Sequence, residues 1–597
     1  MPTYKAPVDD VMFLLRDVLN IEQYGNLPGF ADASPELVEA ILVEGARVCE
    51  EVLQPLNASG DQEGCRRADD GSVATPKGFR EAYAEFAAGG WMGLAASPEY
   101  GGQGLPHTVA AAINEFSSSA NMAFAMYPGL TMGAAAALYV HGSDELKQTW
   151  LPNMLSGKWT GTMNLTEPHC GTDLGLLKTK AVRQPDGSFR ITGTKIFISA
   201  GEHDLTENIV HLVLARIEGA PEGVKGISLF VAPKFLLNAD GTPGERNAVS
   251  CGSIEHKMGI HGNATCVMNY DGATAWLVGE ENRGLNAMFV MMNEARLGVA
   301  IQGLAQSEVA YQNAAQYAKE RLQGRALTGT KAADKPADPI IVHPDVRRTL
   351  LSIRAFNEGA RAFVLWNALK ADVAHRSPDK ATAEAADELL GLMTPVLKGV
   401  LTDVGFDNAV KAQQMFGGHG YIVETGAEQF VRDARIAMIY EGANGIQALD
   451  LVGRKLPRNG GRAAMAFFGE LQQFVSDNEG DEKLAPFLKA LGKSAGHLQQ
   501  ATMWFMQNGL KNPDNAGAGS ADYMHMLGLV AIGYMWAKIL KALHAKKAAG
   551  EALTPALEAK FVLADFYGQR MLPETGAQLA RISAGADAVM ALPAEAF

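Results

Sequence analysis

Apolar and polar residues alternate with helical periodicity in the first part of the chain. Apolar side chains recur at helical spacing over 9–19 and again over 37–53. The second stretch follows Ser34 and Pro35, a pair typical of a helix N-terminus. Similar patterns cover 76–88 and about 106–154. We therefore predict that residues 1–157 form an N-terminal α-helical domain.

The pattern changes near Lys158. Short runs rich in β-branched and aromatic residues alternate with turn signals, and one of these signals is Asp186 followed by Gly187, which predicts a hairpin. The runs cover 189–199, 209–215, 226–231 and 265–270. Residues 158–282 are therefore expected to form a β-domain, either a small barrel or a sandwich.

Helical periodicity returns at Gly284, and one long helix is expected to run to about Arg321. Further helices are expected over 344–370 and 382–413, and together these form a helical domain over 283–457. Residues 458–597 read as an additional C-terminal helical domain. The predicted fold class is α+β, with two helical domains on either side of a β-domain and one further helical domain at the end.

Composition narrows the class of function. The chain has 597 residues, which is too long for one ordinary core, and its formal net charge of -14 argues against a broad surface for nucleic acid or an anionic membrane. Five scattered cysteines without a CxxC pair indicate neither a disulfide framework nor a metal site. They suit a reducing compartment, and the start of the chain does not resemble a signal peptide, so a cytoplasmic protein is expected.

The most apolar window, 122–140, nearly reaches the length of a membrane span. It contains Pro128, Gly129 and Gly133. We therefore expect a pair of buried helices with a break between them.

Two segments of the β-domain carry candidate ligand-binding groups. The loop 163–174 presents the hydroxyls of Thr166 and Thr172 around Pro168 and Gly171, so it can offer donors to a flat heteroaromatic ring or a carbonyl. Alternation along the strand 195–199 places Phe197 and Ser199 on one face. By itself, the loop is better explained as an irregular structural loop, and the alternative for the strand is a half-buried strand end.

A single carboxylate stands out near residue 440. Glu441 follows a β-branched and aromatic run and precedes Gly442 and Gly445, which let backbone approach a ligand closely. Residues 446–454 have the pattern of a helix that begins after them. By itself, a Glu followed by Gly is more often a solvated turn residue.

The order of these motifs is more specific than any one of them. The motifs occur in this order: Thr166 to Asp173, the strand after Lys195, the segment Lys257–Ile260, Arg296, Arg321, the segment Gln414–Gly420, and Ile439–Gly442. In this order of motifs the chain resembles the acyl-CoA dehydrogenase family over about 36–455. The resemblance implies a helical, a β and a second helical domain with FAD between the last two. It also implies oxidation of an acyl-CoA thioester to the trans-2-enoyl-CoA.

In this resemblance Glu441 matches the base that removes the proton α to the thioester. Some members place the base on the long helix instead, at the position of Ala295, which is empty here. Glu294 is the neighbour, but one residue is a rotation of about 100° around a helix. The thioester oxygen would accept hydrogen bonds from the backbone N–H of Glu441 and a ribityl hydroxyl of FAD as enolate character develops.

The resemblance also assigns the cofactor. Thr166 matches the position that forms a hydrogen bond to the flavin ring, and Ser199 matches the position of a hydroxyl near flavin N5. Phe197 replaces the more usual tryptophan, so ring packing is kept and indole hydrogen bonding is lost. The other implied FAD contacts within this group are Met163, Leu165, Gly417 and Ala443. Arg321, Gln323, Gln414 and Gly418 match positions that hold the pyrophosphate and adenine of FAD from a neighbouring subunit. A homodimer or a dimer of dimers is therefore expected, with electron-transfer flavoprotein as the electron acceptor.

For the substrate, Thr172 and Arg296 match contacts to CoA, while Asn293 replaces a frequent aspartate near the adenosine. Gly442 is small enough to let the thioester reach the Glu441 backbone. His261 stands where an arginine is common and is assigned no role.

Both ends of the chain resemble a long bacterial subgroup that includes enzymes oxidising 3-methylmercaptopropionyl-CoA to methylthioacryloyl-CoA in dimethylsulfoniopropionate breakdown. A short- or medium-chain acyl-CoA is the alternative substrate. An acyl-CoA oxidase and a DNA-binding flavoprotein share the fold, but the latter should carry a basic C-terminal block, and the charge of 451–597 is nearly balanced.

Overall fold

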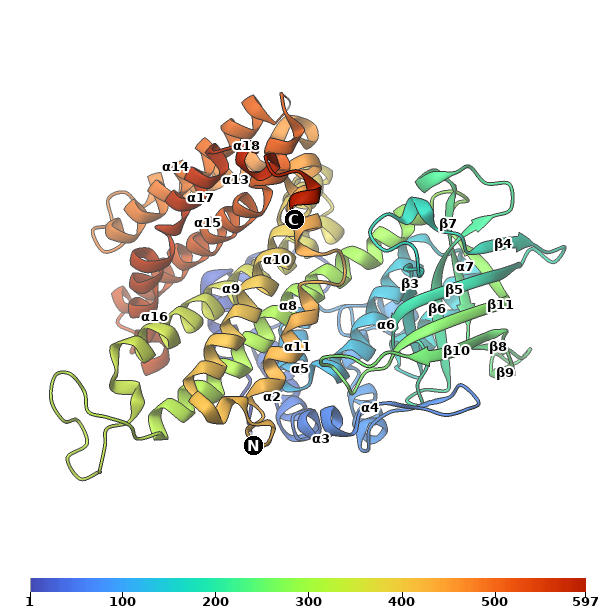
Figure 1. The fold of residues 1–597 in the computed structure, drawn as a ribbon, viewed down its shortest axis with the longest axis horizontal. Helices are drawn as coiled ribbons and strands as arrows, with labels where there is room; N and C mark the ends of the chain where they lie inside the picture. Colours follow the sequence, from blue (N-terminus) through green and yellow to red (C-terminus); the bar gives the residue numbers. More distant parts are fainter. Residues whose placement is uncertain (1, 510) are drawn as a thin grey trace. The chain divides into compact units, whose positions relative to one another are not determined.

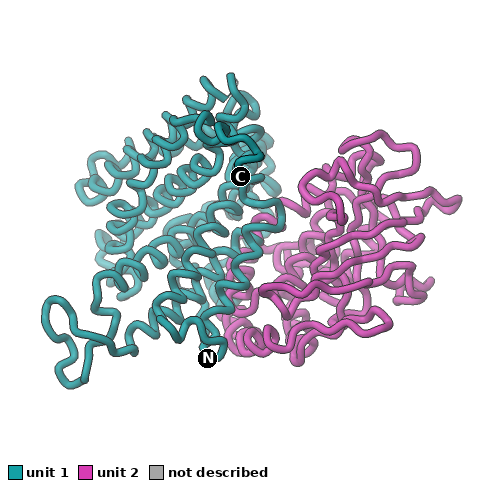
Figure 2. The backbone as a smooth tube through the Cα atoms, in the orientation of Figure 1, with its two compact units in different colours: residues 1–42, 299–597 teal, residues 43–298 magenta. Residues whose placement is uncertain are grey.

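The structure is a computed structural model that describes residues 2–509 and 511–597. The chain forms two compact units, residues 43–298 and residues 1–42 with 299–597, which are coloured separately in Figure 2. Both boundaries fall inside helices, in α2 (Pro35–Val48) and α8 (Gly284–Glu320). The four domains expected from the sequence pattern stay a prediction, since the contacts within the structure divide the chain into two units and not into four domains.

The 43–298 unit begins with helices that the apolar periodicity predicted, apart from the short α3. A proline occupies the first turn of α3, where its missing N–H leaves no helical bond unmade. The helices are α3 (Pro55–Glu63), α4 (Phe79–Ala88), α5 (His107–Ala120), α6 (Met122–His141) and α7 (Asp144–Leu155). A two-stranded ribbon of β1 (Arg66–Arg67) and β2 (Val73–Ala74) lies between α3 and α4.

A small β-barrel forms the rest of this unit (Figure 1). The ring closes in the order β11, β5, β4, β6, β7 and back to β11, while β10 extends it beside β11 and β3 extends it beside β6. β6 pairs with β3 and β4 in parallel, and the other pairings in the barrel are antiparallel. The barrel strands are β3 (Trp159–Asn164), β4 (Lys180–Arg183), β5 (Phe189–Ser199), β6 (Asn208–Ile217), β7 (Ile227–Pro233), β10 (Val249–Ile254) and β11 (Thr265–Val278), and a hairpin of β8 (Phe235–Leu237) and β9 (Pro243–Arg246) follows β7.

Strand β6 shows how the barrel and the helices share one core. Leu212 and Leu214 pack in a cluster with Trp150 and Met154 of α7. Val213, which alternates with them, packs inside the barrel with residues of β4, β5 and β11. Both faces of β6 are therefore buried, which is why its sequence is almost continuously apolar rather than alternating.

The predicted hairpin at Asp186 and Gly187 is present between β4 and β5, and the predicted strands correspond to β5, β6, β7 and the first half of β11. The sequence pattern missed β1 and β2, which lie in the range predicted as helical, and it also missed β3, β4, β8, β9 and β10. These strands are short or mix polar residues with glycine, so they lack the apolar run that marked the others.

The predicted break in the apolar stretch is wrong. Helix α6 is continuous through Pro128, which lies close to the helix start and removes a single backbone donor. In the described residues, α6, α10 (Lys380–Met415) and α15 (Pro513–Ala548) are long and apolar enough to cross a membrane by length and composition. Buried residues make up 67%, 72% and 83% of their most apolar windows, because these helices pack against the rest of the protein.

The second unit is helical. Its long helices α8, α9 and α10 agree with the predicted stretches, and α8 and α10 cross at two glycines: a Cβ on Gly303 would lie 2.4 Å from the Leu401 carbonyl oxygen, and one on Gly405 would lie 2.3 Å from the Gly303 carbonyl oxygen. The helices up to residue 450 are α1 (Val8–Phe13), α8, α9 (Pro344–Arg376), α10, α11 (Ala427–Ala437) and α12 (Asn444–Asp450).

The C-terminal helices belong to the same compact unit. They are α13 (Arg462–Asp477), α14 (Ala485–Asn508), α15, α16 (Pro555–Phe566), α17 (Glu574–Ser583) and α18 (Asp587–Met590). Helix α15 packs on α9, where the Trp536 indole donates to the Ala355 carbonyl at 3.0 Å and Gly359 leaves room for the ring.

A buried ionic cluster joins the N-terminal segment to α9 and α16. Lys560 contacts Asp10 at 2.6 Å and Glu358 at 2.5 Å, and Arg361 contacts Asp10 at 2.7 Å and Glu308 at 3.2 Å. Burial works against the charge on Lys560, but the two carboxylates outweigh it and raise its pKa. Removing one partner from such a cluster is costly, so it fixes how both ends of the chain meet the central helices.

Candidate active site

The loop that leaves β3 carries the first predicted group. Within the 43–298 unit it lies against β5, because the Ile196 N–H donates to the Thr166 carbonyl at 2.9 Å. Met163 lies near the end of β3, and Leu165 and Thr166 are half-buried at the beginning of the loop. Thr166 is thereby held beside the strand segment that contains Phe197 and Ser199.

A buried ion pair supports this loop from below. Lys195, which has 0% exposure, donates to the Leu165 carbonyl at 3.0 Å and to Glu167 at 2.9 Å. Burial lowers the pKa of Lys195 to about 8, although the negative charge of Glu167 acts in the opposite direction. Glu167 also accepts from the Thr179 hydroxyl at 2.6 Å and from the backbone N–H groups of Lys178 and Thr179. The pair therefore fixes the backbone at the start of the loop.

Strand β5 is irregular where the aromatic residue stands. The pairing with β11 skips a residue between Cys266 and Met268, and Phe197 adopts a φ of +58°. This bulge leaves the Phe197 ring 59% exposed and Ser199 half-buried, while Ile198 between them is buried. The bulge interrupts the regular alternation between Lys195 and Ile198, while Phe197 and Ser199 still flank the buried Ile198.

The two predicted CoA contacts lie in different surroundings of the same unit. Thr172 is exposed in the loop that precedes Leu174, and Arg296 is 9% exposed on α8. Asn293 on α8 is exposed, and Glu294 and Ala295 are both half-buried. Helix α8 is continuous through this region, so adjacent residues keep the rotation of about 100° that separates Glu294 from Ala295.

In the helical unit, Glu441 lies in a strained turn between α11 and α12. Glu441 has a φ of +57° and Gly442 a φ of +87°, so two successive residues are left-handed. A non-glycine residue in this region is uncommon and costs energy that the surrounding structure must supply, and such residues concentrate at functional sites. The Glu441 side chain is half-buried.

Two side chains and one backbone hydrogen bond hold this turn. The Gln447 amide donates to the carbonyls of Glu441 at 3.1 Å and Gly442 at 3.2 Å, and Lys398 donates to the Gly442 carbonyl at 2.8 Å. The Asn444 N–H closes the turn on the Met438 carbonyl at 3.1 Å. The φ of +87° favours glycine at 442, and a Cβ there would lie 2.6 Å from the Gln447 amide nitrogen and displace that side chain.

Tyr440, beside Glu441, donates from its hydroxyl to the Gln302 side chain on α8. Burial raises the pKa of Tyr440, and the charge of Glu441 adds to the effect. Tyr440 therefore stays a neutral donor that anchors the turn to α8. Ala443, the remaining predicted residue of this loop, is half-buried immediately before α12.

The predicted adenine and pyrophosphate group lies at one end of the helical unit. Tyr317 near the end of α8 and Phe416 at the end of α10 have ring centroids 4.5 Å apart, which joins the two helix ends. The four residues implied to contact FAD from a neighbouring subunit, together with Gly417, lie within six residues of these rings along the chain. Arg321, Gln323, Gln414, Gly417 and Gly418 are all exposed.

Several residues to which the sequence assigned no role hold the loop after β3 and the Glu441 turn in place. Lys195 was noted only as the start of a motif, and Lys398 and Asn444 were not noted. Lys398 has 0% exposure although it is charged. A lone lysine within the apolar stretch of α10 was the available signal, because a fully buried lysine needs partners.

One group of possible metal ligands occurs among the described residues. Suitable atoms of Glu167, His169 and Cys170 all lie within 4.8 Å of one another. Both oxygens of Glu167 already accept hydrogen bonds, and one of them faces the Lys195 ammonium. The cluster is therefore accounted for as support of the loop.

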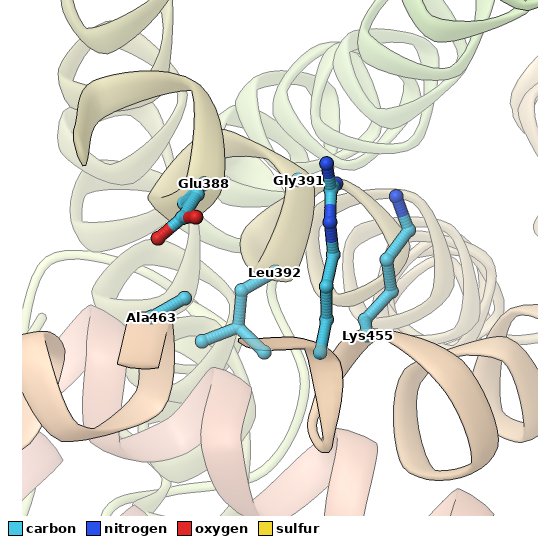
Figure 3. A pocket seen from close by; sticks show the side chains of 6 residues that line it. Glu388, Gly391, Leu392, Lys455 and Ala463 are labelled. Atoms are coloured by element: carbon cyan, nitrogen blue, oxygen red, sulfur yellow. The ribbon is translucent and has the colours of Figure 1, made fainter. Parts of the chain in front are cut away.

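A small hollow between α10 and the turn before α13 is separate from these groups (Figure 3). Glu388 on its wall accepts from Asn459 at 2.6 Å and pairs with Arg462. Leu392 and Ala463 form its apolar side, and Lys455 and Arg458 are also among the residues that line it. Since no predicted site residue lines it, the hollow belongs to the packing of α13.

Comparisons with known proteins match this chain along most of its length. Sequence profiles of four regions match: "Acyl-CoA dehydrogenase, N-terminal domain" over residues 40–158, the "middle domain" over 162–273, the "C-terminal domain" over 282–456, and "Acetyl-CoA dehydrogenase C-terminal like" over 467–593. The last match shows that the C-terminal helices are also a recognised part of this family.

Relatives resemble the whole chain. It is 42% identical to 3-methylmercaptopropionyl-CoA dehydrogenase of Ruegeria pomeroyi, over 98% of this chain and 99% of that protein. It is 35% identical to the broad-specificity linear acyl-CoA dehydrogenase FadE5 of Mycobacterium tuberculosis, over 96% of each chain.

Among solved structures, Caenorhabditis elegans ACDH-11 in complex with C11-CoA has the same fold, with a TM-score of 0.77 at 20% identity over 96% of this chain and 92% of that one. The profiles and the full-length identities together establish the family. The chain belongs to the acyl-CoA dehydrogenase family, and it is an FAD-dependent oxidoreductase that dehydrogenates an acyl-CoA thioester.

Proposed function

We propose that Glu441 is the base that removes the α proton of the acyl-CoA substrate. The observation that supports this most is the strained turn itself: Glu441 and Gly442 are both left-handed and are fixed by Gln447 and Lys398. An α C–H is a weak acid, so a base needs fixed geometry at the reacting carbon. When FAD is bound, it supplies the acceptor for the hydride that leaves the β-carbon.

The thioester oxygen also needs a partner, because negative charge develops on it as the α proton leaves. The backbone N–H of Glu441 is the proposed donor, following the family resemblance. A fixed donor costs little reorganisation during the reaction, and removing one such donor typically slows catalysis by about 10²–10³-fold. The hydrogen bonds to the Glu441 and Gly442 carbonyls orient this peptide segment.

The residues of the β-barrel unit fit the ring system of FAD. Phe197 is 59% exposed on the bulged strand β5, near Ser199 and close to the Thr166 loop. Together these residues offer a flat apolar face and two hydroxyls, which suit a heteroaromatic ring with polar edges. They would hold the flavin, with Met163 and Leu165 beside them.

For the substrate, we propose 3-methylmercaptopropionyl-CoA. The support is the 42% identity over both full lengths to the Ruegeria pomeroyi enzyme of that name. The second relative is named for broad specificity toward linear acyl-CoA, so a linear short- or medium-chain substrate is the competing proposal. In this family both substrates would use the same base and cofactor and differ only in the acyl pocket.

A kcat/KM series separates these substrates. The test uses butyryl-, pentanoyl-, octanoyl- and 3-methylmercaptopropionyl-CoA with an artificial electron acceptor. Pentanoyl-CoA is the matched control, because it replaces the sulfur by a methylene at the same length. We expect the thioether substrate to exceed octanoyl-CoA by at least about 10-fold, the scale on which an apolar pocket discriminates length. An octanoyl-CoA value above the other three would contradict the proposal.

Electron-transfer flavoprotein is the proposed electron acceptor, by family resemblance and because both relatives are named dehydrogenases. An oxidase of the same fold would pass the electrons to oxygen. Turnover in air with a peroxide assay distinguishes them: we expect little peroxide without an artificial acceptor, and peroxide formed in equal amount to enoyl-CoA would favour the oxidase.

We propose that the active protein is at least a homodimer in which Arg321, Gln323, Gln414 and Gly418 contact the FAD of a neighbouring subunit. Their exposure at the joined ends of α8 and α10 supports this, since these polar groups are available to a ligand held elsewhere. An Arg321→Ala variant should lower FAD occupancy after gel filtration, with the oligomer retained. Full retention of the yellow cofactor in that variant would count against the shared site.

A cytoplasmic location is also proposed. All five cysteines are free, and Cys49, Cys170, Cys251 and Cys266 are buried, as suits a compartment that keeps thiols reduced. Fractionation of the source cells tests this, and recovery of the protein in an exported fraction would contradict it.

A further inference from the structure

The turn that contains Glu441 is held from behind by one lysine and one asparagine. Lys398, fully buried on α10, donates to the Gly442 carbonyl at 2.8 Å and to the Asn444 side-chain oxygen at 2.7 Å. Asn444 also closes the turn through its own backbone N–H on Met438. These two residues therefore contact the turn at both its middle and its end.

Asn444 passes this support to the next turn of α10. Its amide donates to the Thr402 hydroxyl at 2.8 Å and to Asp403 at 2.6 Å, and Thr402 in turn donates to the Lys398 carbonyl at 2.7 Å. The amide and carbonyl of Asn444 are thus both used, so its orientation is fixed. One helical turn of α10 forms the base on which the Glu441 turn rests.

The C-terminal helices reach the same turn of α10. His525 on α15 lies 2.9 Å from the second oxygen of Asp403. On either side of this contact α15 packs closely on α10: a Cβ on Gly399 would lie 2.3 Å from the Met524 sulfur, and a Cβ on Gly528 would lie 2.8 Å from Val400. The part of α10 that supports the Glu441 turn is the part that α15 covers.

We infer that Lys398 and Asn444 are positioning residues for Glu441, and that α15 braces them through the contact between His525 and Asp403. This inference rests on the proposed role of Glu441 as the base. It assigns a purpose to the C-terminal helices, which keep one turn of α10, and through it the base, in a fixed place.

A buried lysine with polar partners can also be purely structural, and the ionic cluster around Lys560 in the same unit provides the comparison. Lys560 is also buried, and it pairs with Asp10 and Glu358 on elements that do not include the Glu441 turn. If burial of a charge were the whole effect, replacing either lysine would have the same consequence for the reaction.

The test compares Lys398→Met with Lys560→Met in the FAD-loaded, full-length protein. The rate of flavin reduction at saturating acyl-CoA is measured per bound FAD in the absence of oxygen, together with substrate affinity and thermal unfolding. We expect Lys398→Met to slow reduction by at least about 10-fold at nearly unchanged affinity, since small displacements of a base are costly in rate. The kinetic isotope effect of α-deuterated substrate should rise. Lys560→Met should lower the Tm and keep the rate per bound FAD.

A readout that does not depend on activity is hydrogen exchange of residues 438–447, which should speed up in Lys398→Met and stay unchanged in Lys560→Met. Asp403→Ala and His525→Ala, at partly exposed positions, should slow reduction by about 2- to 5-fold, and Asp403→Asn should restore most of the rate because it keeps an acceptor for Asn444.

These results separate the two proposals. If no acyl-CoA reduces the flavin of the unaltered protein, the proposed function fails. If acyl-CoA reduces it, but Lys398→Met is as fast and exchanges as slowly as Lys560→Met, the positioning inference fails. Should Lys398→Met not fold, wild-type rates and exchange in both Asp403→Ala and His525→Ala would overturn it.

Discussion

The loop after β3 and the turn before α12 are built in the same way in the two units. In each, a lysine with 0% exposure donates to a backbone carbonyl of the segment, Lys195 to Leu165 and Lys398 to Gly442. Both segments carry residues expected to meet ligand. A buried ammonium behind the backbone fixes an irregular segment from one side and leaves its other side to the ligand.

The two lysines differ in their remaining partners. Lys195 contacts a carboxylate, Glu167, directly, whereas Lys398 contacts the neutral amide of Asn444, which in turn contacts Asp403. A direct buried ion pair is costly to break, because the remaining partner is left charged in the interior. A network that ends in a partly exposed pair, Asp403 with His525, can be changed in smaller steps. The barrel loop should therefore be the more sensitive in stability and the helical turn the more sensitive in rate.

The largest effect in the helical turn after loss of the base itself is expected from Gly442→Ala. The new Cβ would lie 2.6 Å from the Gln447 amide nitrogen, so the Gln447 side chain that holds the turn must move, and a φ of +87° strains any L residue. A shift of about 1 Å in a catalytic group costs about 10²-fold in rate, which we expect in kcat. Gly445→Ala is the matched control, since its Cβ would meet nothing within 4 Å. Equal rates in the two variants would contradict the role of the turn geometry in catalysis.

In the barrel loop, Lys195→Met should destabilise the protein by about 3–5 kcal/mol, because Glu167 is left buried without its ammonium. FAD retention should also fall, since Leu165 and Thr166 lose their support. The double variant Lys195→Met with Glu167→Gln should recover a large part of the stability. Denaturant unfolding and flavin content after gel filtration measure these effects.

Lys234→Met is the control for this prediction. It removes another buried lysine of the same unit, but Arg246 continues to pair with Glu202 at 2.8 Å. We expect a smaller loss of stability and unchanged flavin content. The comparison fails if Lys234→Met loses as much FAD as Lys195→Met.

A smaller effect concerns β3, the strand that leads into the barrel loop. His203 and His211 bond the hydroxyls of Thr160 and Thr162 on β3, and burial lowers the pKa of each histidine to about 3. The unfolded chain binds a proton at each near pH 6.5, so it holds more protons than the folded chain between about pH 3 and pH 6.5. Stability therefore rises with pH through this window and is lost as the pH falls through it.

From pH 7 to pH 5 this amounts to about 2 kcal/mol per histidine. His203→Gln and His211→Asn variants should lose correspondingly less stability than the wild type between these two pH values in urea unfolding. An unchanged pH dependence in the variants would show that other groups cause the acid sensitivity.

Much of this arrangement could be predicted from the sequence. Apolar periodicity identified the long helices, and runs of β-branched and aromatic residues identified four barrel strands. The order of motifs identified the family that the comparisons establish. The barrel closure could not be read, since β3 and β4 are short and pair in parallel with β6, which lies far along the chain.

The residues that hold the loop after β3 and the Glu441 turn could not be predicted from the sequence pattern either. Lys195 and Lys398 contact segments that are 28 to 46 residues away in the chain. A sequence motif indicates only the side chains near a ligand, so it does not identify such distant support. The left-handed φ of Glu441 had no sequence signal either, because it results from Gln447 and Lys398 holding the turn. The continuous α6 shows the opposite case, where packing overrides a proline that predicted a break.

The role of Glu441 is tested most directly by Glu441→Gln in the FAD-loaded protein. The amide keeps the size of the side chain and cannot accept the proton, so flavin bleaching by acyl-CoA without oxygen should slow by at least about 10²-fold, as for loss of a general base. FAD content and acyl-CoA binding should stay close to wild type. Bleaching at a near-normal rate in this variant would contradict the assignment of Glu441 as the base.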